Sequence, residues 1–95
     1  MANYKFSEGA KEDLIRKHHF GVQKFGMNQA DKYFNTFFEY FNKISENPFS
    51  FKTVDHIRSG YRQCPFDSDS IHFRLKENKV EIMAIIGMQD KDNKL

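Results

Sequence analysis

Residues 70–76 alternate strictly between apolar and polar side chains, and no other pattern in this sequence limits the fold as strongly. Such alternation is typical of a β-strand with one buried face. The two faces carry Ile71, Phe73 and Leu75 against His72, Arg74 and Lys76. Glu77-Asn78 supplies a two-residue hairpin turn, since Asn readily adopts a positive φ. The next run, 80–86, is apolar on both faces apart from Glu81, which predicts a central strand.

Two shorter strand patterns accompany this hairpin. Tyr4–Phe6 alternates and is expected to form the first strand of the domain. Tyr61–Cys64 is expected to form another strand, which Pro65 ends before a turn at 67–69. Residues 49–59 show no clean period, so no element is assigned to them.

Two amphipathic helices are predicted between the first strand and the hairpin. Ser7 should cap the first helix, whose apolar face recurs every three or four residues at Ala10, Leu14, His18, Val22 and Phe25. Gly26 should end it. Asn28 should cap the second helix, which ends at Asn47-Pro48 because proline disfavours the helical region for the residue before it. The connection is only a residue or two long, which predicts an antiparallel helical hairpin.

The second helix is dense in aromatic side chains: Tyr33, Phe34, Phe37, Phe38, Tyr40 and Phe41. Most should be core, because a 95-residue domain has to bury bulky groups. One or two left exposed on the flanks would suit an amphipathic helix of a partner. The predicted core contains Leu14, Phe34, Phe37, Phe41, Ile71, Phe73, Ile82 and Ile86.

These elements predict a single α+β domain over residues 1–95. Its order is β-α-α-β-β-β, with the helical hairpin packed on one face of a small, mainly antiparallel sheet.

Composition argues against several classes of function. The 15 Lys and Arg against 13 Asp and Glu give a formal charge of +2, too small by itself to indicate nucleic-acid binding. The lone Cys64 cannot form an internal disulfide, which fits a reducing cytoplasm. The sequence has neither the apolar stretch of a signal peptide nor the roughly 20 apolar residues that span a bilayer. We therefore expect a cytoplasmic protein without membrane or direct nucleic-acid partners.

No motif indicates metal, cofactor or triad chemistry. His18 and His19 are adjacent, so on a helix they point about 100° apart and cannot share a metal. His56, His72 and Cys64 add no ligand spacing, and the chain has no glycine-rich phosphate loop. We predict neither a metal site nor a cofactor.

Arg62 and Arg74 fall on neighbouring predicted strands and allow two interpretations. On a shared face they would form a small positive site, with His72 beside Arg74 as an acid or base. Alternatively, both arginines serve the fold and partner contacts through bidentate pairs with carboxylates. We favour the second interpretation.

Several short motifs follow one another along nearly the whole chain: S-E-G-A-K-E-D-L at 7–14, Phe25-Gly26, Glu46-Asn47-Pro48, Gly60-Tyr61-Arg62, Ile71–Arg74 and Val80–Gly87. Their order and spacing resemble the RelE/ParE superfamily of bacterial toxins, in particular its ParE, or plasmid-stabilisation, branch. The resemblance implies a compact toxin of a type II toxin–antitoxin system. It also implies a cognate ParD-like antitoxin, whose tail wraps the toxin.

The superfamily hosts two activities, poisoning of DNA gyrase and ribosome-dependent cleavage of mRNA. The ribonuclease branch pairs phosphate-binding arginines with a Tyr or His near the C-terminus, and residues 88–95 contain neither. The resemblance therefore favours a gyrase inhibitor that acts by binding and is not an enzyme. The alternatives are a ribosome-dependent mRNA endoribonuclease using Arg62, His72 and Arg74, or a degenerate homologue that only binds an antitoxin.

Candidate contact residues follow for both partners. For the antitoxin, aromatic side chains on a helix flank and strand arginines give Tyr33, Tyr40, Arg62 and Arg74. For gyrase, the segment after the last strand gives Met88, Gln89 and Lys91. The family commonly carries a basic residue close to the position that Met88 holds here.

Overall fold

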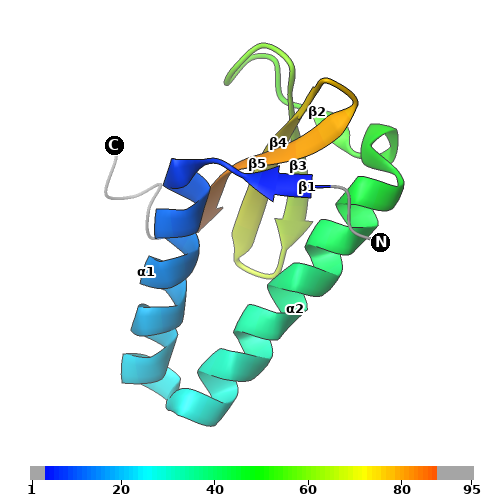
Figure 1. Cartoon of the computed structure of the whole chain (residues 1–95). Helices are drawn as coiled ribbons and strands as arrows, with labels where there is room; N and C mark the ends of the chain where they lie inside the picture. Colours follow the sequence, from blue (N-terminus) through cyan, green and yellow to red (C-terminus); the bar gives the residue numbers. More distant parts are fainter. Residues whose placement is uncertain (1–3, 88–95) are drawn as a thin grey trace.

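Two helices pack against a five-stranded mixed sheet in the computed structural model, which describes residues 4–87 (Figure 1). The elements are β1 (Tyr4–Phe6), α1 (Glu8–Phe25), α2 (Met27–Glu46), the short 3-10 helix η1 (Pro48–Ser50), β2 (Lys52–Thr53), β3 (Tyr61–Phe66), β4 (Asp69–Lys76) and β5 (Lys79–Gly87). The sheet order is β1-β5-β4-β3-β2, with β1 parallel to β5 and the other neighbours antiparallel. The predicted α+β fold is confirmed, and β2 is an addition within the unassigned region.

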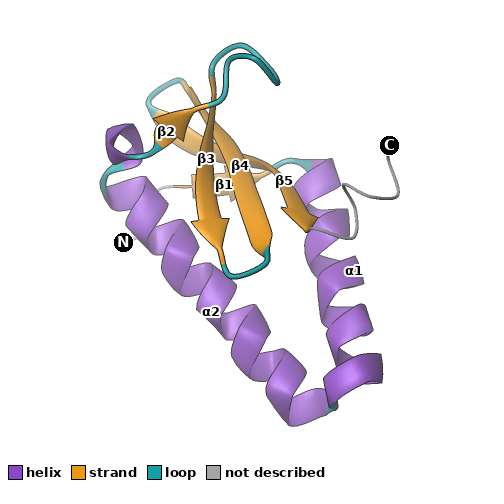
Figure 2. Ribbon diagram, turned by 180° about the vertical axis from the view of Figure 1, so that it is seen from behind, coloured by secondary structure: helices purple, strands orange, loops and turns teal. Residues whose placement is uncertain are grey.

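A single glycine connects the two helices of the hairpin. Gly26 has a φ of +89° and is both the C-cap of α1 and the N-cap of α2. The prediction that Gly26 ends the first helix is confirmed. The prediction that Asn28 caps the second is wrong, because one residue with positive φ reverses the chain and α2 starts at Met27. From Gly26 the two helices diverge toward the sheet (Figure 1, Figure 2).

Ser7 joins the start of α1 to the central strand. Its Oγ accepts a hydrogen bond from the Ala10 N–H at 3.1 Å, so the predicted N-cap is confirmed. The same hydroxyl donates to the Met83 carbonyl at 3.1 Å, and the Ser7 N–H donates to the Ile82 carbonyl at 2.9 Å. The helix therefore leaves the sheet at a fixed point on β5.

Met83 is the extra residue of a β-bulge in β5. His72 pairs with Ala84 while Phe73 pairs with Ile82, so Met83 has no counterpart on β4. One extra residue moves every later side chain to the other face of the sheet. Ile85 is consequently fully buried and Ile86 only partly buried, so the prediction of Ile86 in the core is wrong.

The other predicted core positions are largely confirmed. Buried side chains include Leu14, Phe37, Phe41, Ile71, Phe73 and Ile82. Phe34 is only partly buried, with its ring edge-on to His18 at 5.0 Å between centroids. The predicted apolar face of α1 is buried at Ala10 and Leu14, but Phe25 is 63% exposed because the end of α1 extends beyond the sheet (Figure 2).

One predicted turn is confirmed, and one predicted strand end is wrong. Glu77 and Asn78 have φ values of +54° and +64°, so the predicted two-residue turn is confirmed. The predicted end of a strand at Cys64 is wrong, since β3 continues through Pro65 to Phe66. Pro65 lies beyond the end of β2 on the sheet edge, where strands tolerate proline.

Phe37→Ala tests the register of α2. Phe37 is 1% exposed and its ring lies 4.7 Å from that of Phe66, so truncation should lower the free energy of unfolding by about 3–5 kcal/mol in urea titrations. Ile15→Ala is the matched control, because Ile15 is 69% exposed and its loss should change stability by less than about 0.5 kcal/mol. Equal effects of the two substitutions would contradict this register.

Candidate partner-binding site

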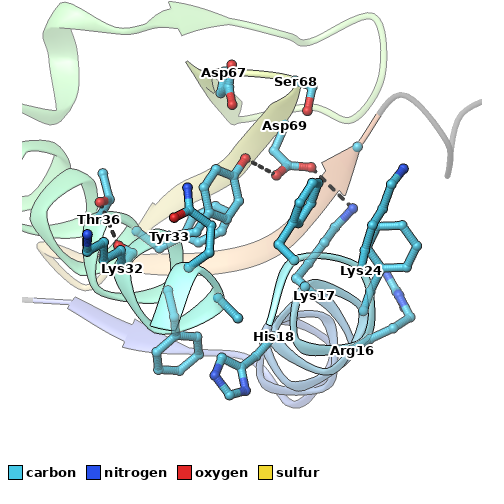
Figure 3. Close-up of a pocket in the computed structure, with 18 residues that line it drawn as sticks. Arg16, Lys17, His18, Lys24, Lys32, Tyr33, Thr36, Asp67, Ser68 and Asp69 are labelled. Carbon is cyan, nitrogen blue, oxygen red and sulfur yellow. Dashed lines mark hydrogen bonds and ion pairs between the residues drawn. The ribbon is translucent and has the colours of Figure 1, made fainter. Parts of the chain in front are cut away.

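A groove of about 880 Å³ opens between the diverging helices, beside the β3–β4 turn (Figure 3). Four phenylalanine side chains line it: Phe20, Phe25, Phe34 and Phe37. Phe20 is 42% exposed and Phe25 is 63% exposed. A concave surface with exposed aromatic side chains is suited to the apolar face of a partner helix.

A buried carboxylate at the base of this groove connects both helices to the sheet. Asp69 begins β4 and is 8% exposed. Its Oδ2 accepts a hydrogen bond from the Tyr33 hydroxyl of α2 at 2.7 Å, and its Oδ1 lies 3.2 Å from Lys17 Nζ of α1 (Figure 3). Burial, followed by the hydrogen bond to Asp69, raises the pKa of Tyr33, so the phenol stays protonated and donates. We refer to Lys17, Tyr33 and Asp69 as the Asp69 cluster.

Gly87 makes room for the Asp69 cluster. It lies opposite Asp69 in the β4–β5 register. A Cβ atom at Gly87 would lie 2.5 Å from Lys17 Nζ and 2.6 Å from Asp69 Oδ1. Sequence reasoning missed Lys17 and assigned Asp69 only to a turn. A glycine ending an apolar strand was the available signal, since it often marks a close approach of other groups.

The groove is positively charged overall. Its ionisable lining contains four basic side chains (Arg16, Lys17, Lys24 and Lys32) and two acidic ones (Asp67 and Asp69), so four minus two gives +2. His18 also lines it, and His18 Nε2 lies 2.8 Å from Asp31 Oδ1 across the two helices. An amphipathic partner with acidic side chains beside its apolar face would match this lining.

The structure brings together two of the predicted antitoxin contacts, Tyr33 and Tyr40. Both rings stack on Phe66, with centroids 5.0 Å and 4.6 Å away respectively. Their spacing of seven residues places them two turns apart on one side of α2. Tyr33 also lines the groove.

The aromatic side chains that are most exposed lie outside the dense run on α2. The six aromatic residues of 33–41 are all buried or partly buried, so the expected exposed flank of this run is not found. The exposed aromatic rings are instead Phe20, Phe25 and Phe49. The first two are exposed because they lie where α1 has passed the end of the sheet.

The structure separates the predicted contacts Arg62 and Arg74. In the β3–β4 register Arg62 lies opposite Phe73, and Arg74 lies opposite Tyr61. Directly opposed residues share a face and successive residues alternate, so the two arginines lie on opposite faces of the sheet. The interpretation that placed Arg62 and Arg74 in one positive site is wrong. A shift of one residue in the strand register moves a side chain to the other face of the sheet, and here it separates the two arginines.

Each arginine is held by a different part of the fold. Arg62 Nη1 donates to the Phe51 carbonyl at 2.7 Å. Arg74 Nε and Nη2 both lie 2.8 Å from Glu81 Oε1, across the β4–β5 pair. His72 does share the face of Arg74, as alternation predicted, but it is only 4% exposed.

The remaining predicted sites concern the tail, metals and membranes. Met88, Gln89 and Lys91 lie outside the described residues. Within residues 4–87, no three His, Cys, Asp or Glu side chains are placed to hold a metal ion. The helices of this described part are also too short or too polar to cross a membrane.

The family model for the ParE toxin of the type II toxin–antitoxin system parDE matches residues 4–91. The chain belongs to the ParE toxin family. Toxin ParE1 of Caulobacter vibrioides is 29% identical to it over 86 residues, which cover 90% of this chain and 88% of that protein. A chain from the solved chromosomal ParDE system of P. aeruginosa superposes with a TM-score of 0.80 at 20% identity. That superposition covers 92% of this chain and 96% of the other, and it shows the shared fold.

Tyr33→Phe tests the Asp69 cluster. The substitution removes one donor from a buried carboxylate, so the free energy of unfolding should fall by about 1–3 kcal/mol at neutral pH. Tyr40→Phe is the matched control, because its ring also stacks on Phe66, and it should cost less than about 0.5 kcal/mol. A similar loss in both variants would mean that the hydrogen bond to Asp69 contributes nothing specific.

Alkaline pH provides a second test of the same contact. Because the pKa of Tyr33 is raised in the folded protein, its contribution is present below the ordinary tyrosine pKa of about 10 and is lost as pH rises above it. Stability measured by urea titration should fall less steeply above that pH in Tyr33→Phe than in the parent. Burial raises the pKa of Cys64 to about 11, and this contribution cancels because both proteins contain Cys64. Parallel pH profiles would contradict the assignment.

Proposed function

We propose that this chain is the toxin of a type II toxin–antitoxin pair and that it inhibits DNA gyrase by binding, without catalysis. The main support for action without catalysis is that Arg62 and Arg74 lie on opposite faces of the sheet. Phosphoryl-transfer chemistry requires cationic groups and an acid or base to converge on one phosphate. In the described residues, Arg62 is directed to the Phe51 carbonyl, and Arg74 is paired with Glu81 next to a buried His72.

We further propose that a ParD-like antitoxin places an acidic amphipathic helix in the groove between α1 and α2. The phenylalanine lining and the surplus positive charge support this occupant. Membership of a family named for the parDE system, and a fold shared with a chain of a ParDE system, support the kind of partner.

The proposed place of action is the cytoplasm, where gyrase works on DNA. The buried, reduced Cys64 is consistent with a reducing compartment.

Two assays on the purified protein separate gyrase inhibition from ribonuclease activity. The first measures gyrase supercoiling and trapped cleavage complexes, and the second measures mRNA cleavage on programmed ribosomes. We expect inhibition of gyrase and intact mRNA. His72→Ala should leave gyrase inhibition unchanged in correctly folded protein. Cleavage of mRNA that disappears in His72→Ala would instead establish the ribonuclease alternative. Inactivity in both assays would contradict the gyrase proposal. If Met88→Arg then restored gyrase inhibition, the missing basic residue at this position would be the cause.

Phe25→Ala tests the groove as the antitoxin site. Phe25 lines the groove and is 63% exposed, so truncation should weaken antitoxin binding about tenfold or more with little change in stability. Titration calorimetry with the antitoxin encoded beside this gene measures the effect. Ile15→Ala, on the same helix but outside the groove lining, is the control and should bind normally. Equal affinities of the two variants would place the antitoxin elsewhere.

A further inference from the structure

The face of the sheet that points away from the helices is rich in basic side chains. The helices pack on the face that carries Ile71, Phe73 and Ile82, so the strand residues that alternate with these point to the opposite side. We refer to that opposite side as the outer face. By the strand registers, it carries one acidic side chain and five basic ones: Glu81, Lys5, Lys52, Arg74, Lys76 and Lys79.

One row of cross-strand neighbours on the outer face runs through four strands. Lys5 of β1 pairs with Glu81 of β5, and Glu81 pairs with Arg74 of β4. Arg74 pairs in turn with Tyr61 of β3. Directly paired residues share a face, so these four side chains lie side by side.

The other cations lie in the rows on either side of this one. Lys76 pairs with Lys79, two residues along β4 and β5 from the central row. On the other side, Lys52 of β2 pairs with Gln63, which is two residues from Tyr61 on β3. Residues two apart on a strand share a face, so the five basic side chains form one patch.

The lysines of this patch are available to a ligand. Lys5, Lys52, Lys76 and Lys79 are exposed, and within residues 4–87 none of them forms an ion pair. Arg74 is half-buried and already paired with Glu81.

The strand registers concentrate positive charge that the net charge of the chain conceals. Five basic side chains minus one acidic side chain give +4 on the outer face, against +2 for all 95 residues. The loop between β2 and β3 adds Arg58 and Asp55, whose charges offset one another. Two minus four leaves −2 for the rest of the chain, so the outer face is the side that attracts a polyanion.

The side chains of this face favour phosphates over carboxylates and bases. Four of the five strand cations are lysines, which bind phosphate as point charges, whereas bidentate pairing with carboxylates favours arginine. Proteins that bind single strands stack the bases on aromatic rings. Tyr61 is the one aromatic side chain that the described strands place on this face, and it is 9% exposed with the Arg58 guanidinium carbon 5.8 Å from its ring centre. A duplex keeps its bases stacked inside and presents its phosphates outward.

We infer that the outer face binds duplex DNA through its phosphates, without sequence preference. From β1 to β2 the patch crosses four interstrand spacings, or about 19 Å. Duplex DNA carries one charge per roughly 1.7 Å of its axis, so several phosphates lie within reach of the lysines. The site is separate from the groove between the helices and does not depend on gyrase being the target.

Fluorescence anisotropy with a labelled 20-base-pair DNA duplex tests the inference on the full chain. Binding is expected at 50 mM salt, and the logarithm of the affinity should fall with that of the salt concentration with a slope of roughly −3 to −5. A duplex of unrelated sequence should bind within about twofold. The double variant Lys76→Glu/Lys79→Glu should bind at least tenfold more weakly. Both positions are exposed, so the fold should persist, and urea titration checks it.

A second double variant controls for net charge. Lys24→Glu/Lys32→Glu changes the charge of the chain by the same amount, but both residues are exposed and line the groove. Its affinity for the duplex should stay within about threefold of the parent. Equal losses in the two double variants would show that binding follows net charge alone and would overturn the inference.

Three other probes identify the ligand class. Tighter binding of single-stranded DNA, of an RNA duplex of the same sequence or of polyglutamate than of the DNA duplex would overturn the inference and assign the outer face to that ligand. The absence of measurable binding to the DNA duplex at 50 mM salt would overturn it as well. These measurements contain no gyrase, so they can fail while gyrase inhibition is observed, and the reverse.

Discussion

The β-bulge at Met83 determines which side chains of β5 meet the helices, and much of the structure follows from it. Before the bulge, Val80 and Ile82 face the core, and after it Ile85 and Gly87 do so. A regular strand would instead have directed 84 and 86 inward. Two polar contacts from α1 and its cap hold this region: Ser7 donates to the Met83 carbonyl, and Asp13 accepts from the Ile85 N–H at 3.0 Å. The strand β1 ends at Phe6, which pairs with Ile82, so it offers no acceptor to the Ile85 N–H. The Asp13 carboxylate supplies that acceptor instead.

Because the bulge brings Gly87 to the helix-facing side, the Asp69 cluster can form. A side chain at position 87 would occupy the space of Lys17 Nζ and Asp69 Oδ1. The cluster in turn connects α1, α2 and β4 at the base of the groove. The helices are therefore connected at two places, at Gly26 where they meet and at Asp69, which contacts Lys17 of α1 and Tyr33 of α2. A groove fixed in this way can receive a partner helix with little rearrangement.

Local patterns predicted the elements well, and they failed where a single residue decides the register. The alternation of 70–76, the Glu77-Asn78 turn and the Ser7 cap depend on neighbours in sequence, and all three are confirmed. Ile86 and the shared face of Arg62 and Arg74 depend on pairing between strands, which a one-residue change reverses. The Asp69 cluster joins residues 17, 33, 69 and 87, and no local pattern connects positions so far apart.

The groove between α1 and α2 limits the kind of partner that the fold can receive. Its depth and its four phenylalanine side chains favour an amphipathic helix inserted along its apolar face. The basic side chains among its lining favour carboxylates on the flanks of that helix. Apolar contact and charge therefore select the same partner, an acidic amphipathic helix.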